Sequence, residues 1–163
     1  MIALYVGGVR SGKSKAAEAR ALSLSANPYY LATTEVMDDE MQKRVTRHQE
    51  QRSDAFRVIE EGVAIDEALD CIEDTVLVEC MSMWLNNMLY YQKSQDEILQ
   101  VVKKLLQSDE DRIFVLNDVG SGIIPIDPLS STFVDLSGLI AQMIAAKADE
   151  VYHCIAGIAT RIK

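Results

Sequence analysis

The sequence predicts an α/β domain in which a mostly parallel sheet lies between two layers of helices. Short apolar runs alternate with helical patterns along all 163 residues, an order that is typical of parallel sheets. The composition, 48% hydrophobic and 25% charged, is that of a folded chain. No linker, repeat or low-complexity segment interrupts it, so we expect a single domain over residues 1–163.

The expected strands are short apolar runs, which suit a parallel sheet buried on both faces. In chain order they are Ile2–Val6, Pro28–Ala32, Phe56–Ile59, Thr75–Val78, Arg112–Leu116, Glu150–Ile155 and Ile158–Ile162. Ligands of such sheets bind at the carboxyl ends of the strands. Polar or glycine-rich residues follow five of these runs, and we expect them to share one active edge: the loop from Gly7, then Thr33-Thr34, Glu60, Glu79 and Asn117-Asp118.

The expected helices fill the segments between the strands. The first of them is rich in Ala, Glu and Leu, which favour a helix. The second begins at Asp38 with acidic residues in its first turn, where the helix dipole favours them. In chain order the helices are Lys13–Leu24, Asp38–Arg52, Ala64–Ile72, Met81–Tyr91, Asp96–Gln107 and Leu129–Lys147, and Gly120–Pro128 is a loop.

The loop after the first strand has the pattern G-x-x-x-x-G-K-[ST], which predicts a P-loop for nucleoside triphosphates. Its glycines allow a tight turn that presents backbone N–H groups to phosphate oxygens, and the next helix points its positive end there. We expect Lys13 to reach the outer phosphates and Ser14 to bind Mg²⁺. The residues that the pattern assigns to nucleotide binding are Gly7, Gly8, Val9, Arg10, Ser11, Gly12, Lys13 and Ser14.

Two further features have a functional and an ordinary interpretation. Glu79 closes a strand and could hold Mg²⁺ through water, or be a plain acid near solvent. Arg44, His48 and Arg52 share one helix face. Two guanidinium groups lower the pKa of an imidazole and keep it neutral and nucleophilic, which suits covalent catalysis at phosphorus. From spacing alone, a solvated helix that happens to carry a histidine is favoured.

Composition argues against two classes of partner. The net charge is −9 without a basic cluster, which argues against nucleic acid and anionic membranes as partners. No apolar run approaches the length of a membrane span, and residues 1–6 run straight into the glycine loop without the pattern of a signal peptide, so we expect a cytoplasmic protein. The cysteines, Cys71, Cys80 and Cys154, are expected to be reduced core thiols, and His153 a structural residue.

Taken together, the motifs resemble the bifunctional adenosylcobinamide kinase/adenosylcobinamide-phosphate guanylyltransferase family of cobalamin synthesis. The resemblance runs nearly end to end, and the histidine motif is its most specific part. It is carried by GGVRSGKS at 7–14, LATT at 31–34, DDEM at 38–41, R-V-x-x-H-x-x-x-R at 44–52, LVEC at 77–80 and N-x-V-G-x-G-I-x-P at 117–125.

The resemblance implies a RecA-like P-loop NTPase sandwich that assembles as a trimer. It implies phosphorylation of adenosylcobinamide by ATP or GTP, followed by transfer of GMP from GTP through a histidine–GMP intermediate. His48 would be the nucleophile and Lys13 the second catalytic residue, with Mg²⁺ at Ser14 and Glu79. Beyond the loop, the implied nucleotide contacts are Ala32, Thr33, Thr34, Gln49, Glu50, Gln51, Arg52, Glu60 and Glu79.

The last long helix departs from the family pattern. Ser131, Val134 and Ala141 stand where the family has two arginines and an asparagine, and Asp118 stands where it often has Glu. Two alternatives therefore stay open: a small-molecule P-loop kinase without the transfer step, and a non-catalytic GTP-binding relative. The choice of base, the corrinoid acceptor and the oligomeric state rest on the resemblance alone.

Overall fold

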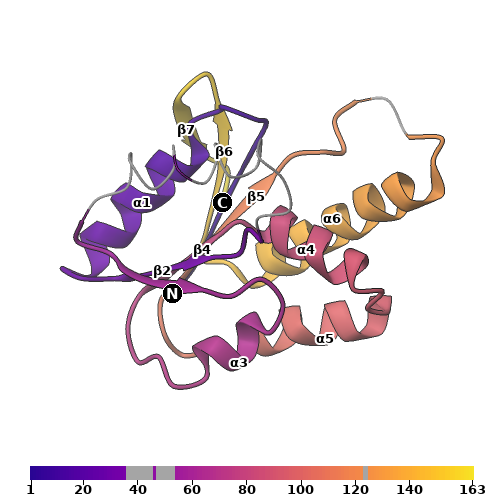
Figure 1. Cartoon of the computed structure of the whole chain (residues 1–163). Helices are drawn as coiled ribbons and strands as arrows, with labels where there is room; N and C mark the ends of the chain where they lie inside the picture. Colours follow the sequence, from indigo (N-terminus) through magenta and orange to yellow (C-terminus); the bar gives the residue numbers. More distant parts are fainter. Residues whose placement is uncertain (36–45, 47–53, 123–124) are drawn as a thin grey trace.

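The computed structural model describes residues 1–35, 46, 54–122 and 125–163 of the chain. Within them, the strands form one sheet of order β3-β2-β4-β5-β1-β6-β7, parallel except for the final pair β6–β7 (Figure 1). The predicted fold class is therefore confirmed. The strands are β1 (Ile2–Gly7), β2 (Tyr29–Ala32), β3 (Arg57–Glu60), β4 (Val76–Glu79), β5 (Arg112–Asn117), β6 (Glu150–Ile155) and β7 (Ile158–Arg161).

The described helices lie on the two faces of this sheet, with α1 on one face and α4, α5 and α6 on the other (Figure 1). Their bounds are α1 (Lys13–Leu24), α3 (Ile65–Leu69), α4 (Met81–Tyr90), α5 (Gln95–Leu105) and α6 (Pro128–Lys147). Most ends agree with the prediction within two residues, and α3 is shorter. The helix expected over Asp38–Arg52 lies outside the described residues except for Thr46.

Alternation along each strand divides the core into two layers. In β1, Leu4 packs with Trp84 and Phe114 in the larger layer beneath α4, α5 and α6. Its neighbour Tyr5 points to the α1 face, where Ala17 and Ala21 allow the helix to approach the sheet closely. Burial of each large side chain stabilises the fold by about 1.5–3 kcal/mol. These layers hold the strand ends, and hence the loops that follow them, in fixed positions.

Side-chain caps account for two helix starts that lie one residue earlier than predicted. Ser94 and Glu97 form a reciprocal capping box at the start of α5. The Asp127 carboxylate accepts from the Ser130 amide at the start of α6, with Pro128 as the first helical residue. Cap residues fix a helix boundary better than apolar periodicity does.

Two sequence expectations need correction. Cys71 is exposed and is not a core thiol, although all three cysteines are free and Cys80 and Cys154 are buried. The expectation that no run approaches a membrane span fails for α6. Among the described residues it is the one helix long and apolar enough by length and composition, with a mean hydropathy of 1.3. It packs against α4, α5 and β1, and 22% of its apolar window is buried in the described structure.

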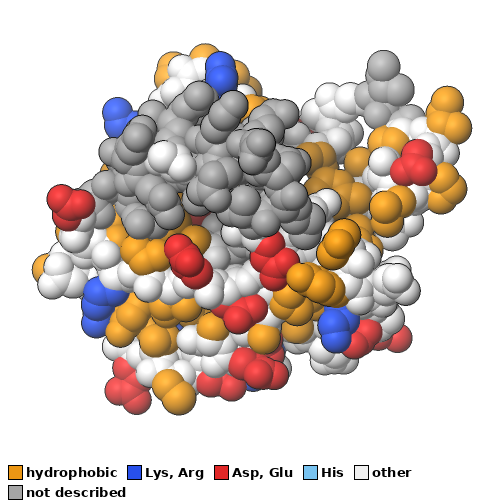
Figure 2. Space-filling model, in the orientation of Figure 1, with side chains coloured by type: hydrophobic (Ala, Val, Ile, Leu, Met, Phe, Trp, Pro, Cys, Tyr) orange, Lys and Arg blue, Asp and Glu red, His pale blue; other side chains and the backbone are white. Residues whose placement is uncertain are grey.

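On the face drawn in Figure 2, the described surface carries many acidic side chains, whereas Lys and Arg side chains stand singly. This distribution agrees with the net charge of −9. A basic stripe of the kind that tracks a phosphate backbone is not seen on the described part of this face.

Candidate functional site

The glycine loop connects β1 to α1 and has the geometry that its motif predicts. Gly12 adopts the left-handed conformation with φ 91°, which turns the chain into the first turn of α1. Lys13 is only 7% exposed, and its Nζ donates to the Gly8 carbonyl at 3.1 Å across the loop. The ammonium group is thereby folded back over the space that the backbone N–H groups surround.

Ser14 and Glu79 meet beside this loop. The Ser14 hydroxyl donates to Oε1 of Glu79 at 2.8 Å, although the two residues come from α1 and β4. Oε2 of Glu79 is buried and has no hydrogen-bond partner among the described residues. Burial raises the pKa of the Glu79 carboxyl to about 7, against the hydrogen bond from Ser14 and the charge of Lys13, which lower it.

This pair has the donor chemistry of a magnesium site. A hydroxyl and a carboxylate are hard oxygen ligands, and Mg²⁺ typically takes only one or two protein ligands beside substrate phosphates. In the described part of the chain, no group of three or more His, Cys, Asp or Glu residues could hold a metal ion. The buried Oε2 of Glu79 has no partner in the described structure, and a carboxylate oxygen of this kind fits a hard cation.

Ser11, within the glycine loop, carries a second unsatisfied polar atom. Its Oγ is buried and without a hydrogen-bond partner in the described structure, and the residue is 7% exposed. Polar atoms that are buried and unpaired are rare in native proteins. In the described structure three buried side-chain atoms have no partner: Ser11 Oγ and Glu79 Oε2 at this loop, and Oδ1 of Asn87 on α4.

The carboxyl ends of β2, β3 and β4 place three predicted residues in one row. Ala32 is in register with Glu60 on one side and with Glu79 on the other. Paired residues of neighbouring strands lie on the same face of a sheet, so Glu60 and Glu79 flank Ala32 with their Cα atoms about 10 Å apart. Glu60 is exposed, because β3 is the edge strand, and Thr34 after β2 is half-buried.

Thr33 is fully buried, and its hydroxyl has a structural partner. It donates to the Cys80 carbonyl and accepts from the Cys80 amide, both at 2.8 Å, while the Thr33 amide donates to the Glu79 carbonyl. These bonds tie the end of β2 to the residue that follows Glu79. A direct contact of Thr33 with nucleotide stays a prediction. Burial also raises the pKa of the Cys80 thiol to about 11, so this cysteine stays protonated.

The predicted histidine site cannot be compared with the structure. His48, Gln49, Glu50, Gln51 and Arg52 lie outside the described residues. Their proposed roles therefore rest on the sequence motif. What the described residues bring together is the loop Gly7–Ser14 with Glu79 at one edge of the sheet, and Ala32 and Glu60 further along the same edge.

Sequence reasoning missed two residues that shape this edge. The Asn87 amide on α4 is fully buried and donates to the carbonyls of Thr33 and Gly62, at 2.7 and 2.9 Å. Its polarity within the apolar stretch Met81–Tyr90 is the signal that could have found it. The Gly157 amide donates to the Ser11 carbonyl at 2.9 Å, so the β6–β7 turn rests on the loop. No local signal shows that contact.

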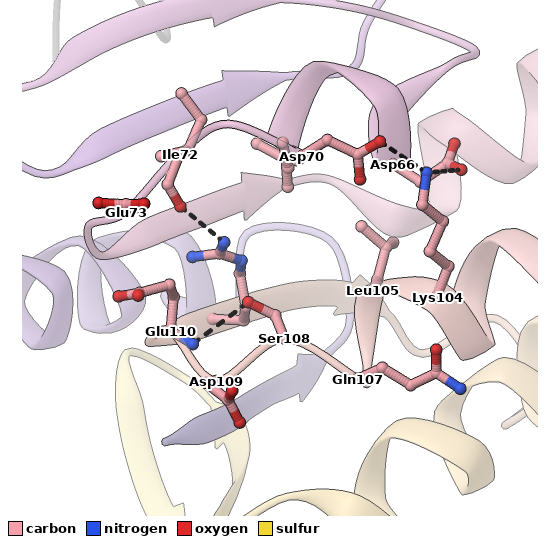
Figure 3. A pocket seen from close by; sticks show the side chains of 12 residues that line it. Asp66, Asp70, Ile72, Glu73, Lys104, Leu105, Gln107, Ser108, Asp109 and Glu110 are labelled. Carbon is pink, nitrogen blue, oxygen red and sulfur yellow. Dashed lines mark hydrogen bonds and ion pairs between the residues drawn. The ribbon is translucent and has the colours of Figure 1, made fainter.

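A cavity of about 360 Å³ lies at the opposite edge of the sheet (Figure 3). It is lined by Arg112, the first residue of β5, whose last residue is at the loop edge. Arg112 donates to the Ile72 and Asp74 carbonyls, and Lys104 pairs with Asp66 and Asp70. These charged groups have partners within the fold, and the cavity is separate from the glycine loop.

Fold and site together define a P-loop nucleotide-binding protein. The sheet order, the loop with its buried lysine, and the Ser14–Glu79 pair are the elements of that class. A solved structure, flagellar accessory protein FlaH from Methanocaldococcus jannaschii, shares the fold with a TM-score of 0.51 at 12% identity. The alignment covers 99% of this chain and 77% of that one.

Sequence comparison places the chain within a family of this class. The family described as cobinamide kinase / cobinamide phosphate guanyltransferase matches residues 3–162. The bifunctional adenosylcobalamin biosynthesis protein CobU of Escherichia coli K12 is 32% identical, with all of both chains covered. CobP of Pseudomonas aeruginosa, of the same description, is 32% identical over 98% of this chain and 96% of its own. The chain belongs to this family.

Proposed function

We propose that this chain phosphorylates adenosylcobinamide with ATP or GTP and then transfers GMP from GTP to adenosylcobinamide phosphate. The product would be adenosylcobinamide-GDP. The observation that carries the proposal is the site formed by Lys13, Ser14 and Glu79 in a chain that belongs to the cobinamide kinase family. Neither the plain P-loop kinase nor the non-catalytic GTP-binding protein is favoured by these findings.

In the kinase step, the chain's own groups position phosphates and neutralise their charge. Phosphoryl transfer passes through a loose transition state, so placement and electrostatics supply most of the catalysis. Lys13, buried and held over the loop, would pair with the outer phosphates once they displace the Gly8 carbonyl. Ser14 and Glu79 would hold Mg²⁺, which when bound neutralises charge on the transferring and leaving groups.

In the transfer step, we propose His48 as the nucleophile. A nitrogen of its neutral imidazole would form a bond to the α-phosphorus of GTP while the bond to pyrophosphate breaks. A phosphate oxygen of adenosylcobinamide phosphate would then displace the imidazole. The proposed nucleotide contacts of this step are Ala32, Thr33, Thr34, Gln49, Glu50, Gln51, Arg52 and Glu60, carried over from the resemblance.

The corrinoid products separate the two steps. Wild-type protein incubated with adenosylcobinamide, GTP and Mg²⁺ should yield the GDP form, identified by mass spectrometry. His48→Ala should stop at adenosylcobinamide phosphate, and Lys13→Ala should give neither product. Adenosylcobinamide-GDP formed at the wild-type rate by His48→Ala would contradict the proposed nucleophile. A wild-type protein that binds GTP and leaves adenosylcobinamide unchanged would contradict the function.

The proposal also includes the location, the assembly and the partners of the protein. We expect a cytoplasmic homotrimer with no nucleic-acid partner. Exposed apolar side chains just before and within the first turn of α6, Ile126 at 100% and Leu129 at 62% exposure, supply surface that association could cover. Light scattering of the purified chain tests the assembly: a mass of one subunit at micromolar concentration would contradict it.

A further inference from the structure

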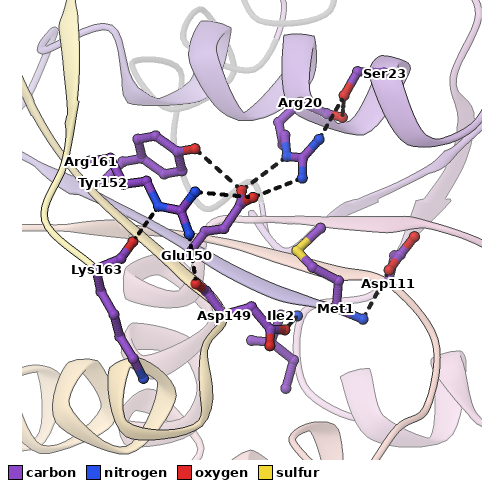
Figure 4. A network of polar contacts seen from close by, with 10 residues as sticks. All are labelled: Met1, Ile2, Arg20, Ser23, Asp111, Asp149, Glu150, Tyr152, Arg161 and Lys163. Carbon is purple, nitrogen blue, oxygen red and sulfur yellow. Dashed lines mark hydrogen bonds and ion pairs between the residues drawn. The ribbon is translucent and has the colours of Figure 1, made fainter.

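Two tyrosine pairs in the described part of the chain differ sharply in their exposure. Tyr5 is 3% exposed and stacks on Tyr152, with ring centroids 4.6 Å apart. The Tyr152 hydroxyl donates to Glu150 within a network of polar contacts inside the fold (Figure 4). Tyr90 and Tyr91, at the end of α4, are 64% and 48% exposed. The second pair therefore presents two adjacent aromatic rings to a partner in solution.

The end of α4 holds the exposed pair in a fixed place. The Tyr91 amide donates to the Asn87 carbonyl, and the Lys93 amide donates to the Met88 carbonyl, both at 2.9 Å. Gln92 has φ of 55°, the left-handed conformation that commonly ends a helix. The two tyrosine rings lie 5.3 Å apart at 84°, edge to face. A surface that is already ordered loses little conformational entropy when a ligand binds to it.

Hydrogen bonds connect this pair to the active edge of the sheet. The Tyr91 hydroxyl donates to Oε2 of Glu35 at 2.8 Å. Asn87, one turn earlier on the same helix, donates to the Thr33 carbonyl at 2.7 Å. Glu35 comes three residues after Ala32, the last residue of β2, so their Cα atoms are at most about 11 Å apart. The pair therefore lies beside the carboxyl end of β2.

The substrate of the proposed function has two parts that lie apart from each other. Adenosylcobinamide is phosphorylated on the hydroxyl of its aminopropanol arm, whereas most of its mass is a flat macrocycle with methyl and amide groups on the rim. When the hydroxyl reaches the phosphates at the glycine loop, the macrocycle must lie outside that loop. Tyrosine suits such a rim, because its ring packs on apolar groups and its hydroxyl bonds to amides.

The charge of this part of the surface also suits the macrocycle. The cobalt centre gives adenosylcobinamide a net positive charge, and the chain carries a net charge of −9. Glu35 is half-buried beside Tyr91, and Glu60 at the end of β3 is exposed. Lys93, close to the pair in sequence, lies 3.5 Å from the Glu97 carboxylate. Opposite charge between a ligand and a surface favours their encounter and selects against anionic competitors.

We propose that Tyr90 and Tyr91 bind the macrocycle of the corrinoid substrate, with Glu35 supplying negative charge beside them. This inference rests on the proposed function, because adenosylcobinamide is the substrate assigned there. It adds a subsite on α4 to a reaction whose other groups lie in the glycine loop and at the strand ends. Since the Tyr91 hydroxyl is bonded to Glu35, Tyr91 offers its ring, whereas Tyr90 offers both ring and hydroxyl.

Separate titrations of corrinoid and nucleotide test the subsite. Adenosylcobinamide is titrated into the full chain by calorimetry, with and without GDP and Mg²⁺, and GTP with Mg²⁺ is titrated in parallel. Tyr90→Ser and Tyr91→Ser should each weaken adenosylcobinamide about tenfold, which corresponds to about 1.4 kcal/mol, and leave GTP unchanged. Tyr91→Phe keeps the ring and should bind the corrinoid within about threefold of wild type. The matched control is Ile162→Ser, at an apolar position that is 67% exposed beyond β7.

Each other outcome overturns the subsite. Wild-type corrinoid affinity in both serine variants would place the macrocycle elsewhere, and an equal loss of corrinoid and GTP would mean that the pair only supports the nucleotide edge. A smaller assembly mass of the serine variants by light scattering would assign the pair to a subunit contact. Wild-type protein that does not bind adenosylcobinamide would contradict subsite and function together. Failure of the function alone looks different: the corrinoid binds with the predicted variant pattern, yet no phosphorylated product forms.

Discussion

The two sides of the phosphate loop, toward β4 and toward β6–β7, are built from different kinds of group. On the β4 side, the Ser14 hydroxyl donates to Glu79, and the buried Thr33 binds the backbone of the next residue, Cys80. On the β6–β7 side, the contacts are made by backbone: the Gly157 amide donates to the Ser11 carbonyl, and the Gly157 Cα lies close to Gly12. Side-chain charges and hydroxyls can act on phosphate and metal, whereas a backbone contact fixes the shape of the loop. The comparison indicates one loop with a chemical side and a structural side.

Removal of the loop lysine should have the largest effect. Lys13→Ala takes away the buried cation that faces the phosphates, and we expect turnover in the kinase step to fall by about a hundredfold to a thousandfold. Steady-state kinetics with adenosylcobinamide measures this. Lys15→Ala, at an exposed position on the same helix, is the matched control and should keep wild-type turnover. Similar losses in both variants would point to general charge and not to the buried position.

The contact between the phosphate loop and the β6–β7 turn can be broken at Gly12. A Cβ there meets the Gly157 Cα at 2.8 Å, and φ of 91° is strained for any residue with a side chain. Gly12→Ala should destabilise the fold by about 1–3 kcal/mol and weaken GTP binding. Gly8→Ala has open space around its Cβ and should melt like wild type. Equal melting temperatures for the Gly12 variant and wild type, by calorimetry, would exclude a rigid contact.

The Asn87 side chain on α4 holds the segment after β2 in place through its hydrogen bonds to the Thr33 and Gly62 carbonyls. Asn87→Ala loses two buried hydrogen bonds and leaves the Thr33 and Gly62 carbonyls unpaired, which should cost about 2 kcal/mol and lower Tm by about 5 °C. Asn86→Ala, one position away and exposed, should change Tm little. If the two variants melt together, α4 does not hold the end of β2 through this amide.

A pH dependence of the metal-free protein is the remaining expected effect. The pKa of Glu79 is raised from 4.5 to about 7 in the fold, so the unfolded chain loses its proton first as pH rises. The contribution of the protonated Glu79 to the free energy of unfolding is therefore fully present below about pH 4.5 and is lost as pH rises through about 7. Glu79→Gln should remove a fall in Tm of several degrees between pH 5 and 8, measured with chelator present. Parallel curves for both proteins would contradict this linkage.

Local pattern predicted the parts of the molecule that depend on neighbours in sequence. The loop Gly7–Ser14 and most strand and helix positions follow from residue spacing alone. The order of the strands, the Thr33–Cys80 pair and the Gly157 turn beside Ser11 do not, because they join residues far apart in the chain. Sequence patterning shows which face a residue takes, but it does not show which strand lies beside it.

Exposure was the other quantity that the sequence left open. Cys71 sits in an apolar stretch but lies on the surface, in the turn that follows α3. Asn87, by contrast, is polar and fully buried because two carbonyls need its amide. The prediction for His48 is neither confirmed nor contradicted, as it lies outside the described residues.

The most direct test of the account is the intact mass of the protein after incubation with GTP and Mg²⁺, beside His48→Ala. A two-step transfer predicts a gain of one GMP in the wild type and no gain in the variant. Addition of adenosylcobinamide phosphate should then return the wild type to its original mass. A wild-type protein that binds GTP and gains no mass, or a variant that gains the same mass, would contradict the covalent step and His48 as its nucleophile.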